Sequence, residues 1–147
     1  MIRKWKDQDF EQILRIWLEG NKEAHDFIPQ EYWEQNLPFL RQALSQADVY
    51  VYEAEGQVQG FVGMQDTYLA GIFVKKQFRM HGIGKQLLNH VKNIHPILVL
   101  NVYQKNKRAV AFYQREGFLI LSKGVDEDTG EADFTMCWKK KAKRELD

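Results

Sequence analysis

A short loop containing two glycines is the first segment of this sequence that could do chemistry. The loop consists of Arg79, Met80, His81, Gly82, Ile83, Gly84 and Lys85. It follows an apolar stretch, 70–74, and behind it apolar residues recur at helical spacing up to Ile94. A helix N-terminus presents unpaired backbone N–H groups and a partial positive charge, and glycine lets an anion approach the backbone closely. The loop therefore predicts an anion site that suits a phosphate.

The charges and the residue spacing of the loop limit the kinds of ligand that it could bind. Arg79 and Lys85 could bind a diphosphate, although they could also be solvated residues beside a tight turn. A P-loop would need glycine at position 79 and Ser or Thr at position 86, which is Gln86. A dinucleotide fingerprint would need a third glycine where Leu87 stands. The spacing therefore excludes both of these nucleotide loops.

Two motifs in order along the chain carry a family resemblance. Arg79, Gly82 and Gly84 fit the pattern Arg/Gln-x-x-Gly-x-Gly/Ala, and residues 106–118 fit N-x-x-A-x-x-F-Y-x-x-x-G-F. Together they resemble the GCN5-related N-acetyltransferase (GNAT) superfamily, and in particular its small stand-alone bacterial members. The resemblance implies that acetyl-CoA is the co-substrate. It also implies direct transfer of the acetyl group to a primary amine, on a protein lysine, a protein N-terminus or a small molecule.

The resemblance also assigns roles to the cofactor side of the site. The backbone of Ile72, Phe73 and Val74 is expected to pair with the pantetheine arm, and the amides of residues 79–85 are expected to hold the pyrophosphate. A free strand N–H near Phe73 could polarise the thioester carbonyl, because donors aimed at developing negative charge are commonly the largest catalytic contribution. Asn106 has two interpretations, a cap for the next helix or a contact to the cofactor, and both can hold together.

Tyr113 matches the general acid of the family, a hydroxyl that could protonate the departing thiolate. The alternative is that Tyr113, like Phe112, is a core aromatic residue. Many members carry a glutamate base on the strand corresponding to residues 68–74, and this sequence has no carboxylate there. Deprotonation of the amine is then expected through water or through His25, which could instead be a surface residue or a helix cap. Cys137 is expected to be a buried structural thiol, not a nucleophile.

The elements that must position these residues follow from hydrophobic periodicity. A strand is predicted at 2–5, then a helix that Asp9 caps and that Gly20 and Asn21 close, then a helical stretch interrupted or kinked at Pro38. The remaining segments are strands at 49–54, 57–65 and 68–74, a helix at 82–92, a strand at 97–103, a helix at 107–116 and strands at 118–122 and 134–139. We expect one α/β (α+β) GNAT-like domain over residues 1–147, with a mixed, mostly antiparallel sheet of six to seven strands and about four helices. Residues 140–147 are expected to be a frayed basic tail.

The composition sets the partners that we expect. Lys plus Arg (21) nearly balance Asp plus Glu (20), so neither nucleic acid nor an anionic membrane is favoured. The sequence has no run of about 18 apolar residues, and its single cysteine excludes an intramolecular disulfide, which suits a cytoplasmic protein. The four histidines form no ligand-like cluster, so no metal is expected. We expect a monomer or a homodimer.

The acidic turn at 126–133 would favour a cationic amine, although it could be a solvated hairpin tip. A different class of function is a non-catalytic acyl-CoA sensor with the same loop. A third is a nucleic-acid contact through the basic tail, which would give strongly salt-dependent binding.

Overall fold

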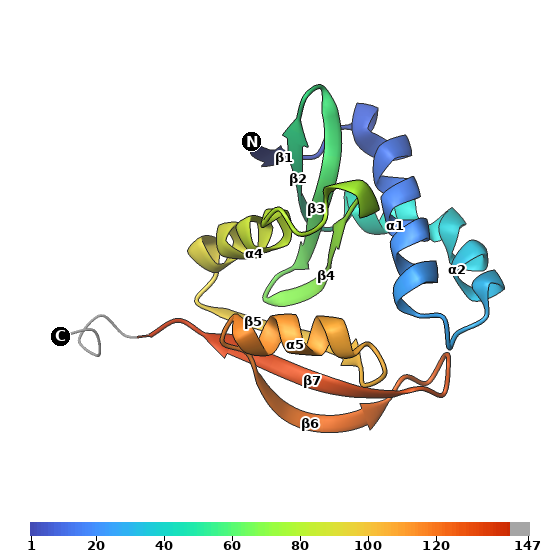
Figure 1. Cartoon of the computed structure of the whole chain (residues 1–147), viewed down its shortest axis with the longest axis vertical. Helices are drawn as coiled ribbons and strands as arrows, with labels where there is room; N and C mark the ends of the chain where they lie inside the picture. Colours follow the sequence, from blue (N-terminus) through green and yellow to red (C-terminus); the bar gives the residue numbers. More distant parts are fainter. Residues whose placement is uncertain (142–147) are drawn as a thin grey trace.

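The computed structural model describes residues 1–141, and its elements follow the predicted order (Figure 1). The strands are β1 (Ile2–Lys4), β2 (Asp48–Ala54), β3 (Gln57–Gln65), β4 (Tyr68–Val74), β5 (Ile97–Tyr103), β6 (Leu119–Val125) and β7 (Ala132–Lys139). The helices are α1 (Phe10–Ala24), α2 (Gln30–Asn36), α3 (Leu40–Ser45), α4 (Ile83–Ile94) and α5 (Lys107–Arg115), with 3-10 turns η1 (Asp7–Asp9), η2 (Leu37–Phe39) and η3 (Lys76–Phe78). Most of the predicted basic tail, from residue 142 onward, lies outside the described residues.

The seven strands form one sheet in the order β1-β2-β3-β4-β5-β7-β6. Neighbouring strands are antiparallel except β4 and β5, which are parallel. This arrangement confirms the predicted mixed, mostly antiparallel sheet. β2, β3 and β4 form a meander, and the turn between β2 and β3 consists of Glu55 and Gly56, which both have positive φ.

Helices cover the two faces of the sheet with separate apolar clusters. On one face, α4 and α5 pack on β3, β4, β5 and β7, and the fully buried side chains there include Leu88, Leu98 and Met136. On the other face, α1 and α3 pack on β2 and β3 through Ile13, Leu44 and similar residues. Within the described part of the chain, no helix has the length and apolar character needed to cross a membrane.

The sheet is divided where β4 meets β5. These strands pair at one bridge among residues 1–141, Tyr68 to Val99, supported by the Val99 N–H donating to the Thr67 carbonyl at 3.0 Å. Beyond the bridge they diverge, so that β2, β3 and β4 run in one direction and β5, β7 and β6 in another (Figure 1). The divergence leaves one edge of β4 unpaired inside the molecule.

Three local predictions for the first helices differ from the structure or are refined by it. α1 does not close at Gly20 and Asn21 but continues to Ala24. Asp9 does not cap it with its side chain, because its carboxylate binds the Arg3 guanidinium at 2.8 and 2.9 Å. Pro38 marks the predicted kink, since η2 joins α2 to α3 there.

Candidate functional site

The open edge of β4 presents backbone groups toward the gap between the diverging strands. The Lys75 N–H donates to the Gln59 carbonyl of β3 at 2.8 Å. In an antiparallel ladder alternate residues turn toward opposite edges, so Phe73 faces β3 while Ile72 and Val74 direct their N–H and C=O groups to the open edge. The free amides that the sequence predicts near Phe73 are therefore those of its two neighbours.

A bulge lies on β4 close to the point where the strands separate. The register against β3 shifts between the Gly63–Gly71 and Met64–Leu69 pairs, which leaves Ala70 as the extra residue. A bulge disrupts the ladder locally and re-aims the backbone beside it. The strand that borders the gap is therefore distorted next to its single bridge to β5.

The predicted anion loop ends at the start of α4. Gly82 is the N-cap residue, it has a left-handed φ of 81°, and no side chain in the described part of the chain caps the helix. The first amides of α4 therefore have no partner within the helix. Ile83 is buried in the core, whereas His81 and Lys85 are exposed and Met80, with a φ of 69°, is 89% exposed. The loop thus combines unpaired amides with basic side chains beside the open edge of β4.

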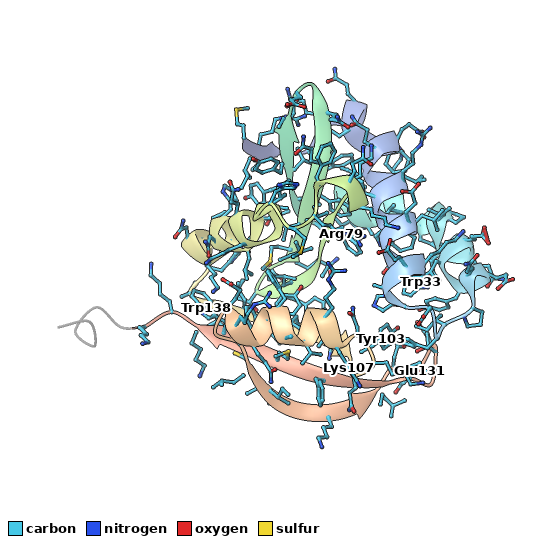
Figure 2. The ribbon with its side chains drawn as sticks, viewed as in Figure 1. Trp33, Arg79, Tyr103, Lys107, Glu131 and Trp138 are labelled. Carbon is cyan, nitrogen blue, oxygen red and sulfur yellow. The ribbon has the colours of Figure 1, made fainter. Side chains whose placement is uncertain are left out.

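Arg79 is held in place by two contacts. Its Nε donates to the Val74 carbonyl at 3.2 Å, and its guanidinium pairs with the Glu23 carboxylate near the end of α1. This hydrogen bond with Arg79 holds the pKa of Glu23 below its usual range, so Glu23 is ionised at neutral pH. In Figure 2, Arg79 lies in the space between α1 and the start of α4. The arginine that the sequence assigns to an anion is therefore bound to a carboxylate of the protein itself.

Tyr113 lies on α5 and packs into the core cluster of α4. Its ring contacts those of Phe112 and Phe118 edge to face, with centroids 5.2 and 5.3 Å apart. Burial, and then the proximity of Tyr68, raises the pKa of Tyr113 above its usual value. The hydroxyl keeps its proton at neutral pH, as a general acid requires. Both interpretations of the sequence, core aromatic and proton donor, fit this position.

Asn106 joins two segments that are far apart in the sequence. Its Oδ1 accepts a hydrogen bond from the Ala109 N–H at 3.3 Å, which caps α5 as predicted. Its Nδ2 therefore faces His25 and donates to the ring Nε2 at 3.2 Å. The two bonds connect the helix that carries Tyr113 to the loop after α1.

His25 lies inside a cluster of aromatic side chains. It stacks on Trp33 and meets Phe27 and Tyr103 edge to face, with centroids 5.0 to 5.7 Å away. Burial lowers the pKa of His25 to about 4, so the ring is neutral at neutral pH. The Nε2 lone pair is used by Asn106, and the buried Nδ1 has no hydrogen-bond partner among residues 1–141. This environment differs from that of a base open to a substrate amine.

The acidic turn between β6 and β7 contacts the same cluster. The Tyr103 hydroxyl donates to Asp126, and burial followed by this contact raises the pKa of Tyr103. Burial and the charges of Asp126 and Asp128 raise the pKa of Tyr32 on α2. Tyr103, Trp33 and Glu131 lie at the same end of the molecule in Figure 2. The loop after α1 and the acidic turn at 126–133 are therefore neighbours.

A polar chain that the sequence did not single out crosses the sheet beside the gap. The Tyr68 hydroxyl donates to Asn101 Oδ1 at 3.0 Å, and Asn101 Nδ2 donates to Thr135 Oγ1 at 2.9 Å. In the sequence these residues are only strand positions, and their alternation with the buried Leu69, Leu100 and Met136 is the one signal that puts them on a common face.

An apolar cavity of about 280 Å³ lies between α1, α3 and the first strands. Trp17, Leu40, Phe61 and Phe73 are among its lining residues, and Ala70 of the bulge also borders it.

Cys137 is half-buried on β7 and is a free thiol. Among residues 1–141 no group of three or more His, Cys, Asp or Glu side chains could hold a metal ion.

Comparison with known proteins gives consistent matches. A family model for the acetyltransferase (GNAT) domain matches residues 45–119. Peptidyl-lysine N-acetyltransferase YiaC of Escherichia coli (strain K12) is 39% identical over 140 residues, which cover 94% of this chain and 96% of that protein. The solution structure of apo-form YjaB from Escherichia coli superposes with a TM-score of 0.84 at 26% identity, covering 96% of this chain and 98% of that one. The PaiA N-acetyltransferase of Thermoplasma acidophilum, solved in complex with coenzyme A, has the same fold, with a TM-score of 0.79 at 22% identity over 95% and 98% of the two chains.

Proposed function

Because this chain belongs to the GNAT family of acetyltransferases, we propose that its acceptor is the ε-amine of a lysine in a protein. The chain is an acetyl-CoA-dependent N-acetyltransferase, as its relatives and its domain show. YiaC and YjaB, its relatives in Escherichia coli, are both named peptidyl-lysine N-acetyltransferases, which supports the choice of lysine.

The cofactor side of the site is assigned from the open edge and the loop. Ile72 and Val74 would pair with the pantetheine arm as a neighbouring strand would. The amides at the start of α4, with Arg79 and Lys85, would hold the pyrophosphate. The residues fit this assignment, because within residues 1–141 the edge of β4 has no neighbouring strand beyond the Tyr68–Val99 bridge, Gly82 adopts a conformation that favours glycine, and no side chain caps the helix.

The protein's own groups account for the proton that the leaving thiolate needs. Acetyl-CoA supplies an acetyl group activated as a thioester. The amine nitrogen bonds to the acetyl carbon, the carbon–sulfur bond breaks, and Tyr113 gives its proton to the sulfur. An N–H of the open β4 edge would stabilise the negative charge on the carbonyl oxygen. A tyrosine hydroxyl is protonated at neutral pH and can therefore supply this proton.

We assign the removal of the amine proton to water and not to His25. The lone pair of His25 is already used by Asn106, and a pKa of about 4 makes the ring a weak base. β4 carries no carboxylate in the position where many relatives have one. His25 instead supports α5 through Asn106, and thereby the position of Tyr113.

The acceptor side supports a cationic substrate carried by a peptide. Asp126, Asp128 and Asp133 lie on or beside the β6–β7 turn and would attract a lysine ammonium. The apolar cavity beside Ala70 could receive a side chain that neighbours the lysine. The free thiol of Cys137 fits a reducing compartment, so we place the reaction in the cytoplasm.

The divergence of β4 and β5 next to the α4 loop and Tyr113 is the observation that carries the proposal. The test is incubation with acetyl-CoA and an acetyl-capped peptide containing one lysine, followed by mass spectrometry and by assay of released thiol. Tyr113→Phe should still bind acetyl-CoA and lose most turnover, by about a hundredfold or more. Tyr52→Phe, on β2 away from the gap, is the matched control. Binding of acetyl-CoA without transfer to any lysine peptide would contradict the choice of acceptor.

A further inference from the structure

The chain of Tyr68, Asn101 and Thr135 lies on the face of the sheet opposite α4. Their neighbours in sequence, Leu69, Leu100 and Met136, are buried in the cluster with α4. Side chains alternate along a strand, so the three polar residues face the opposite side, which α1 and α3 cover only over the first strands. Their hydrogen bonds cross from β4 through β5 to β7.

Tyr68 occupies a defined place relative to the reacting groups. It forms the bridge to Val99 where β4 and β5 separate, and it lies two residues before the bulge at Ala70. Tyr113 lies in the apolar cluster with α4, on the other face of the sheet. Tyr68 and Tyr113 therefore lie on opposite faces of the sheet.

The hydrogen bonding of Tyr68 suits an amine. Its proton is donated to Asn101, whose amide is held by Thr135, so the phenolic oxygen has lone pairs left to accept a bond. A primary amine, charged or neutral, has N–H groups to donate. Burial and the negative charges of Asp133 and Asp126 disfavour the phenolate of Tyr68, so the residue would orient an amine and not deprotonate it.

We propose that the Tyr68 hydroxyl accepts a hydrogen bond from the acceptor amine and thereby directs the lone pair of the amine nitrogen toward the gap. Asn101 and Thr135 are positioning residues for this hydroxyl. This inference rests on the proposed lysine acetyltransferase function. An amine N–H bound to Tyr68 leaves the nitrogen lone pair free for the acetyl carbon. The nearby carboxylates of Asp126 and Asp133 carry negative charge, which would favour a cationic amine as it approaches Tyr68.

The experiment compares wild type, Tyr68→Phe, Thr135→Val and the double variant, with Tyr52→Phe as control. Steady-state acetylation of a capped single-lysine peptide gives kcat and KM, and calorimetric titration gives the affinity for acetyl-CoA. Tyr68→Phe should lower kcat/KM for the peptide about ten- to a hundredfold, as expected for a lost hydrogen bond to a charged group. Thr135→Val should have a smaller effect, and the double variant should match Tyr68→Phe, because Thr135 acts through Tyr68. Affinity for acetyl-CoA should stay unchanged throughout.

Two results would overturn the inference. One is a Tyr68→Phe enzyme with the kcat/KM of wild type, and the other is a double variant whose losses simply add. Titration of the peptide into the complex of each variant with coenzyme A requires no turnover. The peptide affinities should rank the variants in the same order as kcat/KM does. A wild-type protein that neither binds nor acetylates the peptide would instead refute the proposed function, and this inference with it.

Discussion

Replacing Glu23 by Gln should tighten acetyl-CoA binding, although it removes a residue beside the site. Glu23 pairs with the Arg79 guanidinium, and a pyrophosphate needs the same group. The side chains are 24% exposed for Arg79 and 41% for Glu23, so the pair is a partly solvated one. Such pairs contribute about 0.2 to 1 kcal/mol, which corresponds to a fall in Kd of up to about fivefold.

Isothermal titration at low and high ionic strength measures this effect. The gain should shrink in high salt, because both competitors for Arg79 are anions. Glu19→Gln is the matched control, since Glu19 lies one turn earlier on α1 and lines the same small cavity as Glu23 and Arg79. Unchanged or weaker binding by Glu23→Gln, or an equal gain from Glu19→Gln, would refute the competition between Glu23 and the pyrophosphate.

Three further changes test other parts of the structure. Wild type should lose up to about 3 kcal/mol of unfolding free energy as the pH falls from 6.5 to about 4, because the unfolded chain binds a proton at His25 more readily than the folded chain does. His25→Gln should make this loss smaller. Urea unfolding at a series of pH values measures it. Gly82→Ala should lower the unfolding free energy by about 1 to 2 kcal/mol through its left-handed φ, whereas Gly84→Ala, whose Cβ would make ordinary contacts, should keep stability and weaken acetyl-CoA binding. Asp9→Ala should lower the unfolding free energy by about 2 to 3 kcal/mol, because it leaves the partly buried Arg3 without its bidentate partner; thermal and urea unfolding measure it.

The order of the elements could be predicted because its signals are local. β5 (Ile97–Tyr103) and β3 (Gln57–Gln65) have the predicted limits, since alternation and turn residues define them. The end of α1 could not be predicted, because Gly20 serves packing and not termination. A Cβ there would lie 3.2 Å from the ring of Phe73, a residue of another element.

The acceptor side was less accessible to sequence reasoning because its contacts span long separations. His25 meets Asn106 at a separation of 81 residues, and no local pattern in the sequence indicates this bond. Asp9 likewise looks like a cap in the sequence but binds Arg3 instead. Tyr68 lies on a strand both in the sequence prediction and in the structure. Only its hydrogen-bonded chain with Asn101 and Thr135 distinguishes it from an ordinary strand residue.

The unpaired edge of β4 has a consequence for the protein before it meets its substrate. An exposed row of backbone donors and acceptors is a template on which another strand can assemble, and proteins usually cover or interrupt it. Here the proposed cover is the co-substrate itself, so a ligand would fill the place of a missing strand. Folded protein would then be favoured by RT ln(1 + [L]/Kd) as acetyl-CoA rises. The metabolic supply of acetyl groups would thus govern how long the enzyme lasts as well as how fast it works.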